Sequence, residues 1–255
     1  MLKTLNKVLS PVFITRVALL LSLLISLISA GVVSAKPALI PAPPQVSASS
    51  YILIDANSGE TIVEHESYVQ LPPASLTKMM TAYIVENEVA QGNVNLYDEV
   101  PVSIKAWKTG GSKMFIKEGT KVVLEELLKG VIIQSGNDAS IALAEFVAGS
   151  EEAFADVMNQ QAHLLGMTNS SFMNATGLPA EGHYSSASDL AKLALAIIND
   201  FPDQYPLYSE KYFTYNNIRQ PNRNRLLWRD KSVDGLKTGH TEEAGYCLVS
   251  SAERN

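Results

Sequence analysis

The sequence predicts an α+β fold in which an antiparallel sheet is flanked by helices and a helical part is inserted between its N-terminal and C-terminal strands. Two runs rich in β-branched and aromatic residues follow position 50, and two more follow position 233. Between them, from Gly92 to about Asp203, apolar residues recur mostly at helical spacing. Strands at both ends with helices between them are typical of one sheet that receives a helical insertion.

The first 35 residues predict a signal peptide for export. They hold no acidic residue, three basic residues precede an apolar run from Val17 to Ile28, and Val33-Ser34-Ala35 has the small-x-small pattern of a cleavage site. The alternative is an uncleaved N-terminal anchor, and both place the body of the protein outside the cytoplasm. Residues 36–49, with four prolines, are expected to form a linker to the folded part, residues 50–255.

The composition indicates one sizeable globular unit. The 255 residues are 46% hydrophobic and 18% charged, which is enough apolar material for a large core. Without the three cations of the export segment, 17 basic residues stand against 26 acidic ones, a net charge of −9 that argues against nucleic-acid binding. Cys247 is the only cysteine, which excludes an intramolecular disulfide, and the four scattered histidines lack metal-ligand spacing. We therefore expect neither a metal nor a cofactor.

A hairpin and a helix are expected before residue 92. Residues 50–55 and 61–64 are rich in strand-forming residues and are joined through a turn between Asn57 and Gly59. A short extended link follows, and apolar residues then recur at helical spacing as far as about Val89. Ser75 is therefore expected at the start of a helix.

The inserted part, about residues 92–225, is expected to be mostly helical, with an ordered loop over the Gly- and Pro-rich segment 174–186. Helices are expected at four places, over residues 122–134, 139–147, 150–166 and 188–199. Strands are expected again over 233–238 and 246–250. Because the chain stops at Asn255 directly after an expected strand, whose edge would be unprotected, we expect the sequence to be cut short.

The pattern Ser-x-x-Lys at Ser75 and Lys78 suggests a nucleophile with its own base. Side chains three residues apart on a helix lie on one face, so the lysine amine can reach the serine hydroxyl. The helix N-terminus adds free N–H groups and a positive dipole end that favour negative charge on an oxygen. A helix cap followed by a solvated lysine would have the same pattern, so the interpretation depends on what else the chain supplies.

Two further short patterns could complete a site. Ser135 and Asn137, around Gly136, interrupt two apolar helical segments and could present a hydroxyl and a carboxamide to a cleft, although an ordinary N-cap would look the same. The run from Lys237 to His240 lies on an expected strand, where Gly239 would let a substrate backbone approach. Lys237 and Thr238 would offer a charge and a hydroxyl, although an edge strand with an outward lysine is the simpler interpretation.

Taken in order, Ser-x-x-Lys, Ser-x-Asn and Lys-Thr-Gly resemble the motif set of the penicillin-binding protein and serine β-lactamase superfamily. The surrounding residues are similar to the low-molecular-mass penicillin-binding proteins that are serine D-alanyl-D-alanine carboxypeptidases, and the resemblance covers residues 50–250. It rests on the motif segments 71–81, 134–139 and 233–241 and on the segments 111–115, 174–178 and 184–190. It implies a β-lactamase/transpeptidase-like fold.

The resemblance also implies roles for individual residues. Ser75 would attack the carbonyl between two D-alanines and form an acyl-enzyme, with Lys78 as its base. Ser135, Asn137 and Lys237 would complete the set of catalytic side chains. The substrate would be bound by Thr238, Gly239 and His240, and by Arg223, which matches an arginine found in the family before the Lys-Thr-Gly strand. The backbone N–H groups of Ser75 and His240 would form the oxyanion hole.

The implied substrate is the peptidoglycan stem pentapeptide, and β-lactam antibiotics are the implied covalent inhibitors. The implied location is the periplasm or the outer face of the bacterial cytoplasmic membrane. The family's last strand or strands, its C-terminal β-rich domain and its C-terminal membrane helix have no counterpart in this sequence, so membrane association would depend on segments beyond this chain.

Four other functions stay open at this point. A class A β-lactamase would need a Glu-x-x-Leu-Asn pattern in the loop 174–186, where Glu181 is instead followed by Gly-His-Tyr. A penicillin sensor or scaffold would acylate without turning over peptide, and a D,D-endopeptidase would cleave cross-links with the same motifs. A Ser-His-Asp hydrolase would need His183 or another histidine beside the serine, and no Gly-x-Ser-x-Gly pattern is present.

Overall fold

The computed structural model of the chain describes residues 46–254, and helix α2 (Lys78–Ala90) lies at the centre of their fold. The predicted signal peptide (1–35) and most of the predicted linker (36–49) lie outside the described residues. Helix α2 follows a 3₁₀ turn, η1 (Ala74–Thr77), so Ser75 lies in the turn that opens the helix, as predicted.

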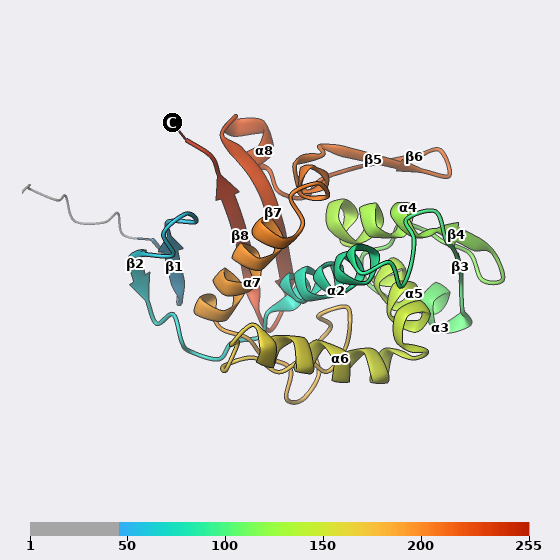
Figure 1. The fold of residues 1–255 in the computed structure, drawn as a ribbon, viewed down its shortest axis with the longest axis horizontal. Coiled ribbons are helices and arrows are strands. Elements are labelled where there is room, and N and C mark those ends of the chain that lie inside the picture. Colours follow the sequence, from blue (N-terminus) through green and yellow to red (C-terminus); the bar gives the residue numbers. More distant parts are fainter. Residues whose placement is uncertain (1–45, 255) are drawn as a thin grey trace, which may run out of the picture. The chain divides into compact units, whose positions relative to one another are not determined.

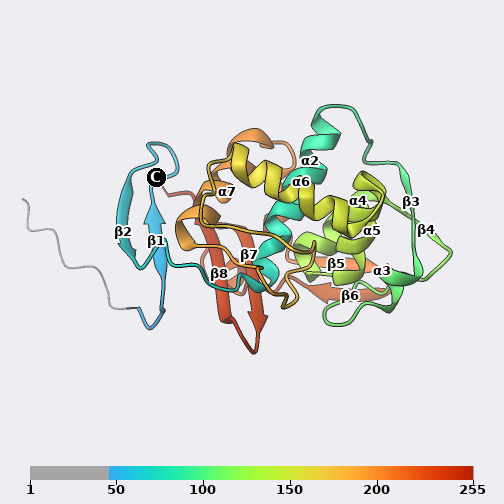
Figure 2. The ribbon, with the colours of Figure 1, turned by 90° about the horizontal axis from the view of Figure 1, so that it is seen from below.

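Helix α2 is buried on all its faces rather than on one. Every residue from Lys78 to Glu86 is buried. Helices α5 (Asn137–Ala148), α6 (Glu151–Leu164) and α7 (Ala187–Asp200) all pack against it (Figures 1 and 2). A helix enclosed in this way needs internal partners for its polar side chains, and that requirement shapes the site described below.

The predicted strands form two antiparallel hairpins. Strand β1 (Tyr51–Ile54) pairs with β2 (Thr61–His65), and β7 (Val233–Thr241) pairs with β8 (Gly245–Ala252). In the described residues these hairpins are separate two-stranded sheets instead of one continuous sheet. Helix α7 contacts both β1 and β8, so one helix covers both hairpins (Figure 1). The helices between the hairpins give the expected α+β arrangement.

Two further antiparallel strand pairs were not predicted. Strands β3 (Glu99–Pro101) and β4 (Lys121–Val123) are too short to show an alternating pattern. Strands β5 (Tyr212–Tyr215) and β6 (Ile218–Pro221) are joined by Asn216 and Asn217, which both have positive φ, 48° and 62°. Two left-handed residues are what a tight hairpin turn of the primed type needs, and asparagine tolerates that conformation.

The helical insertion is confirmed in outline. Ser150 caps α6 by accepting a hydrogen bond from the N–H of Ala153 at 3.1 Å. Helix α7 begins at Ala187, one residue earlier than predicted, because Ser186 is its cap and accepts from the N–H of Asp189 at 3.2 Å. The remaining helical elements are α3 (Ile104–Lys108), α4 (Leu124–Lys129), a π-helical segment η2 (Gly130–Gln134), η3 (Tyr205–Ser209) and α8 (Leu226–Arg229).

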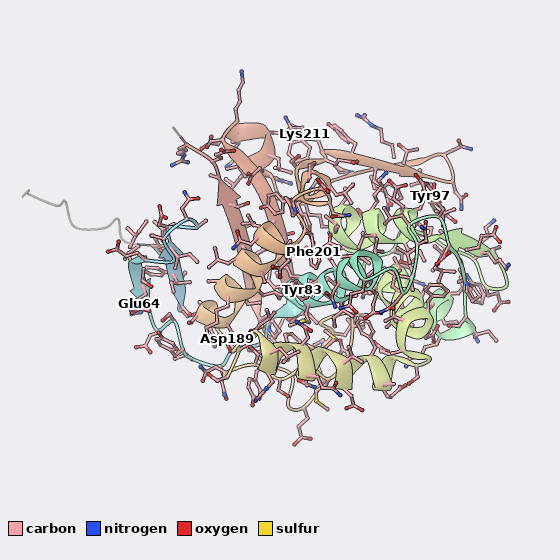
Figure 3. The ribbon with its side chains drawn as sticks, in the orientation of Figure 1. Glu64, Tyr83, Tyr97, Asp189, Phe201 and Lys211 are labelled. Carbon is pink, nitrogen blue, oxygen red and sulfur yellow. The ribbon has the colours of Figure 1, made fainter. Side chains whose placement is uncertain are left out.

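The core joins α2 to α7 through aromatic contacts. The rings of Tyr83 in α2 and Phe201, directly after α7, are in contact, with centroids 5.1 Å apart and an angle of 59° between their planes (Figure 3). The hydroxyl of Tyr83 donates to a carboxylate oxygen of Asp200 at 2.8 Å, which satisfies this partly buried polar group. Within residues 46–254 no helix has both the length and the apolar character needed to cross a membrane.

Glu86 is a buried acid on α2, and its raised pKa makes the free energy of unfolding depend on pH. Its two carboxyl oxygens lie 3.3 and 3.2 Å from the hydroxyl of Tyr208 in η3, and only 1% of the residue is exposed. Burial raises the pKa of Glu86 from 4.5 to about 8, against a smaller lowering by the Tyr208 hydrogen bond. Between these two values the unfolded chain releases a proton that the folded chain keeps, so stability falls as pH rises.

The substitution Glu86→Gln should remove this pH dependence while keeping the contact with Tyr208. Between pH 5.5 and 7.5 the free energy of unfolding of the wild type should fall by roughly 3 kcal/mol more than that of the variant. Urea unfolding of both proteins at the two pH values measures the difference. Equal pH dependence in the two proteins would contradict a protonated Glu86.

Candidate active site

Ser75 and Lys78 are brought together at the start of α2. The Lys78 Nζ atom lies 3.2 Å from the Oγ atom of half-buried Ser75. The same Nζ atom donates to the carbonyl oxygen of Thr176 at 2.5 Å. Lys78 is 1% exposed, so the carbonyl and the serine replace water as its partners.

The surroundings of Lys78 favour its neutral form. Burial is the largest effect, and the positive charges of Lys237 and Arg223 add to it; together they hold the pKa of Lys78 well below 10.5. Asp138 acts in the opposite direction, as the smallest of the four influences. A neutral amine beside a serine hydroxyl can accept its proton.

Ser135 comes from another part of the chain and directly follows the π-helical segment η2. Its backbone is left-handed, with φ 65°, a conformation that a serine adopts only when its surroundings impose it. The Lys237 Nζ atom donates to the Ser135 Oγ atom at 2.9 Å. Lys237 is 3% exposed, and burial together with the charge of Arg223 lowers its pKa to about 7. Lys237 therefore points inward, unlike the outward lysine of an ordinary edge strand.

Asn137 is the first residue of α5 and is fixed from both its backbone and its side chain. Its Nδ2 atom donates to the carbonyl of Gly110 at 2.8 Å, and its N–H donates to the carbonyl of Ser112 at 2.7 Å. The next residue, Asp138, is fully buried. Its carboxylate accepts from four backbone N–H groups, those of Met114, Phe115, Ile116 and Ala139. Asp138 thus ties the loop 110–116 to the start of α5 and so fixes Asn137.

Strand β7 passes close to the serine because Gly239 has no side chain. A Cβ atom at this position would lie 3.1 Å from the backbone nitrogen of Ser75 and 3.2 Å from that of Leu76. Thr238 is half-buried, and His240 is exposed with its ring against Tyr246 at a centroid distance of 4.3 Å. The strand therefore places all three predicted binding residues beside η1.

Arg223 is exposed, but its neighbours in the chain are anchored. The side-chain amide of Asn224 donates to the carbonyl of Gly235 in β7 at 2.8 Å, and both Asn222 and Asn224 are buried. This anchoring keeps Arg223 close enough to the site for its charge to lower the pKa of both Lys78 and Lys237. The structure thus brings every predicted site residue to the start of α2 or its immediate surroundings.

The loop 174–183 contributes more to the site than the sequence suggested. Gly177 has φ 79°, and a Cβ atom there would lie 1.8 Å from the carbonyl oxygen of Ala74, so only glycine fits. The side chain of Asn174 accepts from the N–H groups of Thr176 and Gly177 and holds this turn. The carbonyl of Thr176 is thereby aimed at Lys78.

His183 and Thr77 form a second connection between this loop and the serine segment, which sequence reasoning missed. The Nδ1 atom of His183 accepts from the N–H of Met173 at 3.1 Å, so its Nε2 atom carries the proton and donates to the Oγ1 atom of Thr77 at 2.8 Å. Burial, with a smaller effect of Lys78, lowers the pKa of His183 to about 4, so the ring is neutral. The threonine within Ser-Leu-Thr-Lys was the one available signal.

Comparison with protein families gives a match over most of the chain. The model of the family described as D-alanyl-D-alanine carboxypeptidase matches residues 38–255. The D-alanyl-D-alanine carboxypeptidase DacA of Escherichia coli K12 is 48% identical over 221 residues, which are 84% of this chain and 55% of the relative. The D-alanyl-D-alanine endopeptidase of Pseudomonas aeruginosa is 31% identical over 252 residues, which are 92% of this chain and 77% of the relative.

Solved structures of the same kind share the fold. The carboxypeptidase DacD from Francisella tularensis superimposes with a TM-score of 0.83 at 35% identity, over 89% of this chain and 68% of that one. Penicillin binding protein 5 from Haemophilus influenzae gives 0.82 at 44% identity, over 84% of this chain and 63% of that one. The chain spans about half the length of the DacA relative, 55%.

The contact between His183 and Thr77 should affect both stability and the chemistry of Ser75. In His183→Ala the hydroxyl of Thr77 loses a buried partner, which should cost about 1–3 kcal/mol of unfolding free energy. Acylation of Ser75 by a fluorescent penicillin should slow about tenfold, because the loop that aims Thr176 at Lys78 is loosened.

The matched variant His183→Gln keeps an N–H donor of similar reach and should recover most of the acylation rate. Stopped-flow acylation and urea unfolding of the three proteins test this pair of expectations. Acylation at the wild-type rate in His183→Ala would show that the connection has no influence on the serine.

Proposed function

The chain belongs to the family of D-alanyl-D-alanine carboxypeptidases, and we propose that it removes the terminal D-alanine from peptidoglycan stem pentapeptides through an acyl-enzyme on Ser75. The observation that carries the proposal is the buried Lys78 amine 3.2 Å from the Ser75 hydroxyl, in surroundings that lower its pKa. The folded part that would do this is residues 50–255, with the helical insertion at about 92–225.

Lys78 starts the reaction as the general base. Its hydrogen bond to the Thr176 carbonyl fixes one N–H and leaves the nitrogen lone pair free to turn toward Ser75. Lys78 takes the proton of the serine hydroxyl while Oγ bonds to the carbonyl carbon between the two D-alanines. The carbonyl π electrons move to its oxygen, and the negative charge is met by the backbone N–H groups of Ser75 and His240.

Collapse of the tetrahedral intermediate breaks the peptide bond and releases D-alanine. The departing amine needs a proton, and Ser135, hydrogen-bonded to Lys237, donates its hydroxyl proton to the amine and takes up in exchange the proton that Lys78 holds, which leaves Lys78 neutral again. The net result is that the proton taken from Ser75 leaves with the amine. Water then attacks the acyl-enzyme by the same route, with Lys78 again as base, and restores the serine.

The free carboxylate of the substrate is bound at the end of β7. Thr238 offers a hydroxyl there, and Lys237 and Arg223 offer positive charge. Asn137, held by the carbonyl of Gly110, is suited to contact the amide of the stem peptide. Binding of an anion beside two lysines also returns positive charge to Lys237 at neutral pH, because an anion favours the cationic form.

Three related functions would begin with the same acylation of Ser75. A D,D-endopeptidase is the second candidate, because the chain covers 77% of the length of the Pseudomonas aeruginosa endopeptidase. β-Lactams would acylate Ser75 and leave slowly, since Glu181, the acid of the loop 174–186, is exposed and lies outside the Glu-x-x-Leu-Asn pattern of class A β-lactamases. A sensor or scaffold would acylate as well but release no D-alanine.

We propose that the protein works in the periplasm, on the outer face of the cytoplasmic membrane. The proposal rests on the signal-peptide pattern of residues 1–35 and on the substrate, which lies outside the cytoplasm.

The direct test is D-alanine release from diacetyl-Lys-D-Ala-D-Ala, combined with mass spectrometry of the penicillin-treated chain. The wild type should release D-alanine and carry one penicillin adduct on the peptide that contains Ser75, and Ser75→Ala should lose both properties. An adduct without release would favour a sensor. Turnover of benzylpenicillin at tens per second would favour a β-lactamase, and release only from cross-linked dimers would favour the endopeptidase.

The substitution Lys237→Ala tests the electrostatic part of the proposal. It removes a positive charge that lowers the pKa of Lys78, so the Lys78 pKa should rise and the amine should be protonated up to a higher pH. Penicillin acylation at pH 7 should slow at least tenfold, and the acidic limb of its pH profile should move to higher pH. The exposed Lys117→Ala serves as the control, and an unmoved limb in Lys237→Ala would contradict the coupling.

A further inference from the structure

The positive charge of the protein is concentrated in one segment next to the site. Residues 211–231 hold six basic residues and one acidic residue, a net charge of +5. The other described residues hold 10 basic and 25 acidic ones, a net charge of −15. None of the six cations forms an ion pair among residues 46–254, and the one acid of the segment, Asp230, pairs with Arg254 outside it. The segment therefore presents uncompensated positive charge on an acidic molecule.

Aromatic side chains lie among these cations and are partly exposed. The rings of Tyr212 in β5 and Trp228 in α8 meet edge to face with centroids 5.8 Å apart, and 42% and 41% of the two residues are exposed. The guanidinium of Arg219 in β6 lies 3.6 Å from the centre of the Tyr212 ring. Arg219, Tyr212 and Trp228 thus form a contiguous stack, which we call the aromatic-basic surface, and the stack fixes the orientation of each member.

The strand register places this surface on the outer face of the β5–β6 hairpin. Phe213 and Gln220, which pair across the two strands, are buried, so the neighbouring positions of Tyr212 and Arg219 point outward. Arg225, directly before α8, and Arg229, the last residue of α8, are both exposed. Lys211, labelled in Figure 3, directly precedes β5.

The hairpin and α8 pack against both walls of the candidate site. Strands β5 and β6 contact η2, which directly precedes Ser135, and α8 contacts β7, which carries Lys237. The side-chain amide of Gln220 donates to the carbonyl of Lys113 at 3.0 Å, in the loop tied to Asn137. Arg223 lies between β6 and α8 and already acts on the two lysines of the site. The elements that carry this surface are therefore immediate neighbours of the elements that carry Ser135 and Lys237.

We propose that the aromatic-basic surface binds the glycan strand and the anionic stem peptides of polymeric peptidoglycan, next to the stem that reacts. Partly exposed aromatic rings stack on the apolar faces of sugars, and unpaired arginines attract peptide carboxylates. The choice of peptidoglycan as the ligand of this surface rests on the proposed function. The surface would make the chain bind polymeric peptidoglycan more tightly than a small peptide, which cannot reach beyond the site.

The substitution Arg219→Glu tests this surface, with Lys117→Glu as a control that makes the same charge change at an exposed lysine elsewhere. Cosedimentation of the full chain with insoluble peptidoglycan sacculi should fall at least threefold in Arg219→Glu and in Trp228→Ala, and should change little in Lys117→Glu. D-Alanine release from sacculi should fall in parallel. Release from diacetyl-Lys-D-Ala-D-Ala should stay within twofold of the wild type in all three variants.

The outcomes separate the two proposals. Failure of the wild type to release D-alanine from the small peptide would overturn the carboxypeptidase proposal, whereas cosedimentation with sacculi would still report on the surface. Unchanged cosedimentation of Arg219→Glu, or an equal loss in Lys117→Glu, would overturn the surface. A loss of binding to phosphatidylglycerol vesicles in Arg219→Glu, with sacculus binding intact, would also overturn it and assign the surface to a membrane.

Discussion

Two lysines, Lys78 and Lys237, are buried within one small site, and the rest of the site depends on whether their amines are protonated or neutral. Each is almost inaccessible to water, and neither forms an ion pair among residues 46–254. Burying an ammonium group without a counterion is costly, and a lowered pKa avoids that cost by making the neutral amine the stable form. A group that would be an inert cation at the surface therefore becomes a base beside a serine.

The polar partners of these lysines are held by strained or glycine-dependent backbone. Ala74, Phe115 and Ser135, three of the six non-glycine residues with positive φ in the described part of the chain, belong to the segments that build the site. Such conformations persist only where surrounding contacts impose them. Here the buried carboxylate of Asp138, the close approach of Gly177 to Ala74 and the bond between His183 and Thr77 impose them. The site is therefore fixed before a substrate arrives.

The sequence predicted the order of the elements and the motif residues, because both leave local signals. Helical periodicity, the Ser150 cap and the strands around Lys237 are visible within short windows. The hairpin β5–β6 left only the local signal of Asn216 and Asn217, which was missed. The full burial of α2, the pairing of β3 with β4 and the separation of the two outer hairpins depend on contacts between residues far apart in the sequence. The same holds for the roles of Glu86, Asp138 and His183, whose partners, apart from Ala139 next to Asp138, lie 10 to 122 positions away. The short motifs identified the side chains of the site but did not predict the backbone that positions them.

The most direct test is a titration of the chain with ¹³C-labelled lysine side chains, followed by NMR and assigned with the variants Lys78→Arg and Lys237→Arg. Two signals, each missing from one variant, should titrate below the other lysines, with the Lys237 signal near its pKa of about 7. Titration of the Lys78 signal together with the surface lysines, near the usual value of roughly 10.4, would contradict the role of Lys78 as a neutral base.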